Sequence, residues 1–147
     1  MAREHEVSRA ASELRTVLGQ LVRRLRSESA LPLPQAVVLA RLERDGQATA
    51  SGLAAHERIR PQSIAETVHE LEAAGLIDRI ADKSDRRQIL IGITEQGRTE
   101  LTADRARRDG WLTNAIRANL SVEEQATLVN AVKLLQRLLE RDSAETS

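Results

Sequence analysis

The segment from Pro61 to Gly75 constrains the fold more than any other part of the sequence, because signals for both ends of a helix are present. Proline is favoured at the first helical position, and glycine is favoured just past the last one. Ile64, Val68 and Leu71 recur at helical spacing, which predicts one buried stripe. The opposite side is polar and is left to make contacts outside the domain.

A basic hairpin is predicted directly after this helix. Residues 76–80 and 88–93 are rich in β-branched side chains, which favour strands. The connection, residues 82–87, has almost no apolar residue and carries Lys83, Arg86 and Arg87. A helix-turn-helix followed by a basic finger is a DNA-reading arrangement, with the helix in the major groove and the finger at the minor groove or the backbone. The alternative is a small α+β core piece with a solvated charged loop.

The rest of the chain reads as helices with local start and stop signals. Two prolines at positions 32 and 34 separate the first helix from the second. The polar run 104–109 is expected to be solvated or to lie near phosphates. The predicted helices are 7–27, 34–44, 50–57 with Thr49 as N-cap, 95–119 with Thr94 as N-cap, and one from Val122 after a Ser121–Glu124 capping box.

Three short motifs in this order resemble the MarR family of bacterial winged-helix transcription regulators. They are Leu71-Glu72 followed by Gly75-Leu76, the tip Asp85-Arg86-Arg87, and Thr94 followed by Gly97. The resemblance covers nearly the whole chain, since the length and the flanking helices fit as well. It implies a mainly α (α+β) fold, a winged helix-turn-helix.

The first and last helices carry more leucine-rich surface than one light contact would bury. In the family, the terminal helices interlock with a second subunit. The resemblance and the surplus apolar surface together predict a homodimer. The N- and C-terminal regions 1–33 and 95–147 would form its helical dimerisation region, and 34–94 the DNA-binding region. Two reading helices roughly 34 Å apart would match a pseudo-palindromic site.

Composition excludes several classes of function. The 147 residues include no cysteine, and 22 basic residues balance 22 acidic ones. A thiol redox switch and a cysteine metal site are therefore excluded. A sequence-specific reader needs only a local positive patch. With one tryptophan and no tyrosine or phenylalanine, the chain lacks stacking platforms for single strands, which favours duplex DNA.

No enzyme, cofactor or metal site is predicted, because the three histidines share no metal-ligand spacing and no nucleophile or phosphate-loop motif occurs. No apolar run is long enough to span a membrane, and no signal peptide is recognisable, so the cytoplasm is the expected location.

Candidate DNA contacts cluster at the start of the helix that begins at Pro61. Gln62 can pair with adenine at two atoms, and Ser63 can meet a base edge or a phosphate. Glu66 accepts from a cytosine amino group or pairs with a neighbouring arginine. The helix N-terminus itself attracts a phosphate. The predicted contacts here are Arg58, Arg60, Pro61, Gln62, Ser63, Glu66 and Thr67.

At the hairpin tip, the resemblance assigns one arginine to the minor groove, oriented by Asp85. We favour Arg87, because Asp85 and Arg87 lie on the same side of an extended chain, and Arg86 would then meet phosphate. Arg79 and Lys83 are further phosphate candidates. A loop salt bridge alone is the alternative.

The resemblance also implies a small aromatic or lipophilic acid as effector of a repressor. Trp111 and Arg23 are the candidates for binding it, although the favoured role for Trp111 is in a core or a dimer interface. The rival function is a winged-helix module that binds a protein partner instead of DNA.

Overall fold

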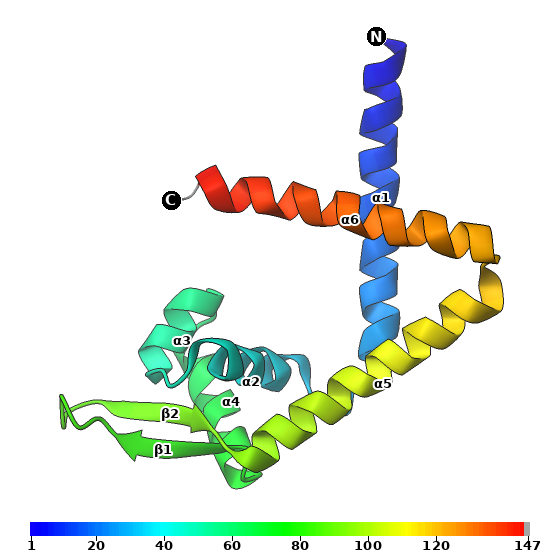
Figure 1. Cartoon of the computed structure of the whole chain (residues 1–147). Coiled ribbons are helices and arrows are strands. Elements are labelled where there is room, and N and C mark those ends of the chain that lie inside the picture. The colour runs from blue at the N-terminus through cyan, green and yellow to red at the C-terminus, as the bar shows by residue number, and fades with distance from the viewer. Residues whose placement is uncertain (146–147) are drawn as a thin grey trace. The chain divides into compact units, whose positions relative to one another are not determined.

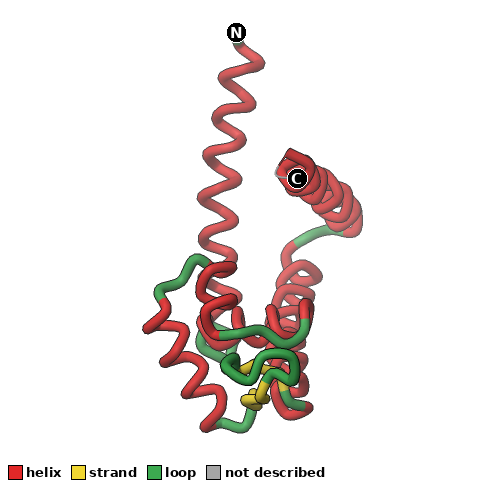
Figure 2. Tube along the Cα trace, turned by 90° about the vertical axis from the view of Figure 1, so that its left-hand side faces the viewer, coloured by secondary structure: helices red, strands yellow, loops and turns green. Residues whose placement is uncertain are grey.

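The computed structural model describes the backbone of residues 1–145 and the side chains of residues 1–140. In this part of the chain, helices dominate and the strands form one hairpin, as Figures 1 and 2 show. The predicted mainly α winged helix-turn-helix is confirmed. The elements are α1 (Ala2–Arg26), α2 (Leu33–Asp45), α3 (Ala50–Glu57), α4 (Pro61–Ala73), β1 (Ile77–Ala81), β2 (Ile89–Ile93), α5 (Glu95–Asn119) and α6 (Val122–Glu145).

The chain divides into two compact units, Met1–Arg108 and Asp109–Ser147, and α5 contributes to both. The first unit contains α1 as well as all the elements of the predicted DNA-binding region. This division into compact units falls inside α5. A dimerisation role for the terminal helices stays a prediction.

Helix α1 begins at Ala2, five residues before the predicted start at Val7. The prediction followed apolar periodicity, which begins only at Val7. The preceding residues are mostly good helix formers, and Glu4 in the first turn is favourable beside the positive end of the helix dipole.

The core of the first unit is built from aliphatic side chains alone. Helices α2 and α4 supply most of it, and the predicted stripe on α4 is fully buried. Burial of this surface is the main favourable term in folding, at about 25 cal/mol per Å² of apolar area. The largest buried apolar side chains are Val38, Leu39, Leu42, Leu53, Ile64, Val68, Leu71, Ile77, Ile91 and Leu101.

The two strands pair antiparallel, with Ile77 opposite Ile93 and Ala81 opposite Ile89. Ile91 is buried, but Ile89 is about half exposed, so the core covers the apolar side of β2 only near its base. Ala48 adds a short bridge that the sequence did not indicate: its backbone N–H and C=O both bond to Ile91, at 3.1 and 2.7 Å. This bridge attaches the hairpin to the start of α3.

The junction of α4, β1 and α5 is tightly constrained. The Thr94 hydroxyl donates to the Gly75 carbonyl oxygen at 2.7 Å and accepts from the Gly97 N–H at 3.0 Å. Gly75 has a φ of 74°, the left-handed region that glycine adopts readily. A Cβ on Gly97 would lie 2.2 Å from the Leu76 carbonyl oxygen. The end of the predicted reading helix is thereby held against the start of α5.

Candidate nucleic-acid interface

Helices α3 and α4 are joined by a short turn whose conformation is set by Arg58 and Ile59. Thr49 caps α3 as predicted, accepting from the Gly52 N–H at 3.0 Å. Arg58 ends α3 in the left-handed conformation, with a φ of 53°, and its side chain is exposed. Ile59 is partly buried against the core and its N–H bonds to the Ala54 carbonyl at 3.0 Å. The turn therefore sets the direction in which α4 leaves.

The first turn of α4 presents hydrogen-bonding groups to solvent. Arg60 is the N-cap, and no side chain accepts from the N–H groups of this helix end. The N–H groups of Gln62 and Ser63 also lack an intrahelical acceptor because of their position. The side chains of Gln62, Ser63 and Glu66 are exposed. This end of α4 can therefore receive an anion or a base edge.

Thr67 does not belong to this exposed face, which corrects its prediction as a DNA contact. Its side chain is only 7% exposed, and its hydroxyl donates to the Ser63 carbonyl oxygen at 3.0 Å. Thr67 follows Ile64 by three residues and precedes Leu71 by four, so helical spacing places it on the buried side.

The hairpin tip is folded by its two aspartates. Asp82 Oδ1 accepts from the Ser84 N–H at 3.0 Å and from the Ser84 hydroxyl at 2.8 Å. These bonds, first the backbone N–H and then the hydroxyl, lower the pKa of Asp82. Asp85 Oδ1 accepts from the backbone N–H of Arg87 at 3.1 Å. The tip is thus a turn that stays ordered by its own side chains.

The role predicted for Asp85 is therefore corrected. It holds the backbone of Arg87 and not the guanidinium group, because the tip turns at this point and is not extended. Lys83, Arg86 and Arg87 are exposed. Within the described residues, none of these three side chains has an ion pair or a hydrogen bond. Three cations at the tip thus remain available to a partner.

Arg79 is placed differently from its prediction as a phosphate contact. Its guanidinium Nε binds Glu72 Oε2 of α4, at 2.5 Å, and both side chains are partly exposed. The ion pair connects β1 to α4 and neutralises much of the charge of Arg79. By contrast, the exposed Arg58 and Arg60 have no such partner among the described residues. Charge available to an anion therefore lies before α4 and at the hairpin tip.

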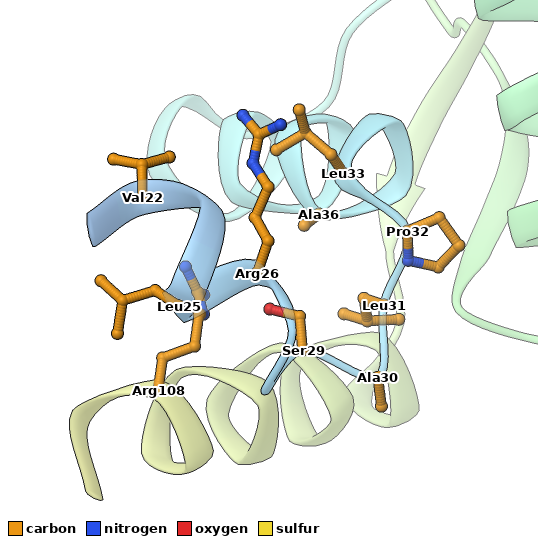
Figure 3. A pocket seen from close by; sticks show the side chains of 10 residues that line it. All are labelled: Val22, Leu25, Arg26, Ser29, Ala30, Leu31, Pro32, Leu33, Ala36 and Arg108. Atoms are coloured by element: carbon orange, nitrogen blue, oxygen red, sulfur yellow. The ribbon is translucent and has the colours of Figure 1, made fainter. Parts of the chain in front are cut away.

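A pocket of about 500 Å³ lies elsewhere in the same unit, between the end of α1, the start of α2 and α5 (Figure 3). Figure 3 shows Arg108 rising from α5 beside Leu25, and Arg26 extending toward Leu33. The remaining lining is mostly apolar. Arg23 and Trp111, the predicted ligand contacts, are not among the lining residues. The two arginines of the pocket were not recognised in the sequence.

Next to this pocket, Asp104 is completely buried, which corrects its place in the run 104–109 that was expected to be solvated or to lie near phosphates. Arg105, Arg107 and Asp109 of that run are exposed. Its Oδ1 accepts from the backbone N–H groups of Ala30 at 2.8 Å and Leu31 at 3.2 Å. Arg107 and Arg108 lie 3.3 and 3.4 Å from its two oxygens. Burial alone would raise the pKa of Asp104, but the bonds from Leu31, Ala30 and Arg107 outweigh burial and lower it.

Among residues 1–145, no helix combines the length and the apolar content that crossing a bilayer requires. The described residues also contain no group of three metal-ligating side chains.

The helix-turn-helix with its basic hairpin defines a winged-helix protein. Known proteins are similar to this chain in sequence or in fold. A sequence model of the MarR family matches residues 31–89. An HTH-type transcriptional regulator of Mycobacterium tuberculosis is 32% identical over 136 residues, which cover 90% of this chain and 94% of that protein. One of Mycobacterium leprae is 31% identical with the same coverage. The chain therefore belongs to the MarR family and is a transcriptional regulator.

Solved structures agree with this assignment. A transcriptional regulator protein from Pseudomonas aeruginosa is 38% identical, with a TM-score of 0.79 over 89% of this chain and 94% of that one. An S. aureus MepR mutant bound to an oligodeoxyribonucleotide is 22% identical and shares the fold, with a TM-score of 0.67 over 87% of this chain and 96% of that one.

Proposed function

We propose that this regulator is a ligand-responsive repressor that binds a pseudo-palindromic duplex site as a homodimer. The observation that carries the proposal is the pairing, within one compact unit, of an uncapped polar helix end on α4 with three unpartnered cations at the hairpin tip. The oligodeoxyribonucleotide bound by the MepR mutant of the same fold supports DNA as the partner.

In this proposal, α4 enters the major groove with its N-terminal turn foremost. Gln62 reads adenine through two hydrogen bonds, and Ser63 meets a base edge or a phosphate. Arg58 and Arg60 contact the phosphates beside this groove. Their lack of intramolecular ion pairs supports the role, because no existing interaction has to be broken. Glu66, one turn further along the exposed side of α4, accepts from a cytosine amino group.

The hairpin tip is proposed to reach the neighbouring minor groove. Arg87 enters it, while Arg86 and Lys83 contact phosphates. The hydrogen bond from the Arg87 N–H to Asp85 supports insertion of Arg87, although Asp85 was predicted to orient the side chain of the arginine and not its backbone. It fixes the position from which the side chain leaves the tip and leaves the guanidinium group to the DNA.

A second copy of the chain is proposed to cover the apolar side chains that one chain leaves exposed. On α6, Leu134 and Leu138 are 58% and 64% exposed, and on α1, Val17 is 56% exposed. Exposed apolar side chains that recur on one helix, as Leu134 and Leu138 do on α6, mark an association surface. A two-fold dimer would present two copies of α4 to successive major grooves.

The α1–α2–α5 pocket is proposed to bind a small aromatic or lipophilic acid that weakens DNA binding. Arg26 and Arg108 would hold the carboxylate, and Val22, Leu25 and Leu33 would contact the apolar part. Arg108 also lies near Asp104, which holds the backbone of the α1–α2 connection. A ligand in the pocket would thereby affect the position of α2. The ligand-bound and the ligand-free protein would then differ in their affinity for DNA.

The proposed interface is tested by the substitution Arg87→Ala. Loss of a minor-groove arginine should weaken binding to a selected site at least about tenfold, and reduce the slope of log affinity against log salt by about one. The measurement is a mobility shift at several salt concentrations. Arg3→Ala, which removes an exposed arginine on the first turn of α1, is the matched control. Equal affinity of the Arg87 variant and the unmodified protein would overturn the wing assignment.

A second substitution, Gln62→Ala, distinguishes recognition of a base from nonspecific electrostatic binding to DNA. It should relax the preference at one position in each half-site while leaving affinity for other sequences nearly unchanged. A uniform loss over all sequences would contradict base reading by Gln62.

A further inference from the structure

A second hollow, of about 320 Å³, lies between the start of α2 and α4. Its α2 side is formed by Leu33 and Val37, and Ile59 contributes from the turn before α4. Its α4 side consists of the face on which Ser63, Glu66, Thr67 and Glu70 recur at helical spacing. Leu33 is 44% exposed and Val37 is partly buried, so apolar surface is open to a ligand at this place.

The charge of this hollow has a single sign. Glu66 and Glu70 are its only ionisable lining side chains, and they lie one helical turn apart. Within the described residues, Glu66 has no hydrogen bond or ion pair. Glu70 Oε2 accepts from the neutral side chain of Gln35 at 3.0 Å. Neither carboxylate is therefore neutralised by a cation of the described chain.

We propose that the α2–α4 hollow binds a compact organic cation with an apolar body, of the aryl-ammonium class. The apolar body would contact Leu33, Val37 and Ile59, and the cationic group would lie between Glu66 and Glu70. An anion is disfavoured at this place by the same two carboxylates. The hollow thus differs in ligand class from the α1–α2–α5 pocket, where Arg26 and Arg108 supply positive charge.

Binding of the cation also excludes DNA, and this part rests on the proposed function. Ser63 and Glu66 line the hollow and also belong to the proposed reading side of α4. A molecule held against these two side chains occupies space that a base edge requires. The protein would therefore respond to a cation by direct competition, without any change in dimer shape.

The binding step is tested on the full chain, without DNA, by titration with benzyltrimethylammonium followed through backbone amide NMR shifts. Shifts should concentrate in residues 32–37 and 59–70. Benzoate and benzyl alcohol are the matched anionic and neutral probes. They should bind more weakly at this place, by up to about fivefold for the neutral probe, because an exposed ion pair contributes at most about 1 kcal/mol.

The double variant Glu66→Gln/Glu70→Gln keeps the shape of the hollow and removes its charge. It should lose most of the preference for the cation, while its affinity for benzyl alcohol stays unchanged. Asp109→Asn, an exposed position on α5, is the control with the same loss of charge. No localised shifts with the cation, or a preference for it that survives in the double variant, would overturn the proposal.

The competition step is measured separately, as a mobility shift with increasing benzyltrimethylammonium. Weaker DNA binding with rising cation concentration in the unmodified protein, and a smaller effect in Glu70→Gln, whose altered residue is not a proposed DNA contact, supports exclusion. A cation that binds at the hollow and leaves DNA affinity unchanged would overturn exclusion. If the protein binds no DNA at all, the proposed function is refuted. The NMR titration without DNA still shows whether the α2–α4 hollow binds the cation.

Discussion

Replacing Asp104 by alanine tests the role of the buried carboxylate in holding the α1–α2 connection. The side chain is 1% exposed, and it satisfies the backbone N–H groups of Ala30 and Leu31. Its removal leaves both N–H groups without this acceptor, at about 1–3 kcal/mol for each group that water cannot reach. It also removes the counter-charge of Arg107 and Arg108. Truncating one partner of a buried, hydrogen-bonded charge cluster costs about 3–5 kcal/mol.

The expected loss of 3–5 kcal/mol is a large share of the about 5–15 kcal/mol that stabilises a typical domain. Urea unfolding followed by circular dichroism, at one fixed protein concentration, measures it. Asp104→Asn keeps one oxygen for the two N–H groups and should cost less than Asp104→Ala. Asp109→Ala, on the same helix but exposed, is the control and should change stability by less than about 0.5 kcal/mol. A loss below about 1 kcal/mol for Asp104→Ala would refute this reasoning.

Three further predictions follow from single features. Because bonds from the backbone lower the pKa of Asp104, the carboxylate stabilises the fold above about pH 4, and this stability should be lost as pH falls through the lowered folded pKa. Acid titration of Asp104→Asn should lack that loss. Gly97→Ala should destabilise by several kcal/mol in thermal unfolding, or shift α5, because its Cβ would collide with the Leu76 carbonyl. Leu138→Arg should shift sedimentation toward the monomer, whereas Gln136→Arg, on the other side of α6, should not.

Elements whose limits are set by local signals could be predicted from the sequence. Pro61 and Gly75 mark the ends of α4, and Thr94 caps α5 as expected. The capping box also forms: the Glu124 N–H donates to the Ser121 hydroxyl at 3.2 Å, and the Ser121 N–H donates to Glu124 Oε1 at 2.9 Å. In each case the residues that decide the structure are neighbours in the chain, so the pattern contains the whole interaction.

Interactions between distant segments were not predictable in the same way. Asp104 was expected to be solvated or to lie near phosphates because its neighbours are charged, yet it is buried and accepts from the backbone N–H groups of Ala30 and Leu31, more than 70 residues earlier. One signal was available: Asp104 follows the buried Leu101 by three residues, which places both on one face of α5. The bridge between Ala48 and Ile91 had no comparable signal, because a single residue pair shows no periodicity.

For the candidate interface, the sequence predicted the exposure of several side chains but not all of their intramolecular contacts. The exposed side chains of Gln62, Ser63, Arg86 and Arg87 lie where the sequence indicated. The ion pair of Arg79 with Glu72 was missed because it joins residues on different elements. The orientation of Asp85 was missed because it depends on the conformation of the tip, which an assumed extended chain does not describe.

Selection of bound fragments from a pool of random duplexes tests the central claim most directly. A homodimer that inserts two copies of α4 should enrich a two-fold symmetric sequence, with half-site centres about 10 base pairs apart. The Gln62→Ala protein, put through the same selection, should lose the preference at one position in each half. Enrichment of sequences without symmetry, or of none, would contradict the account of α4 and the hairpin as a paired DNA-reading surface.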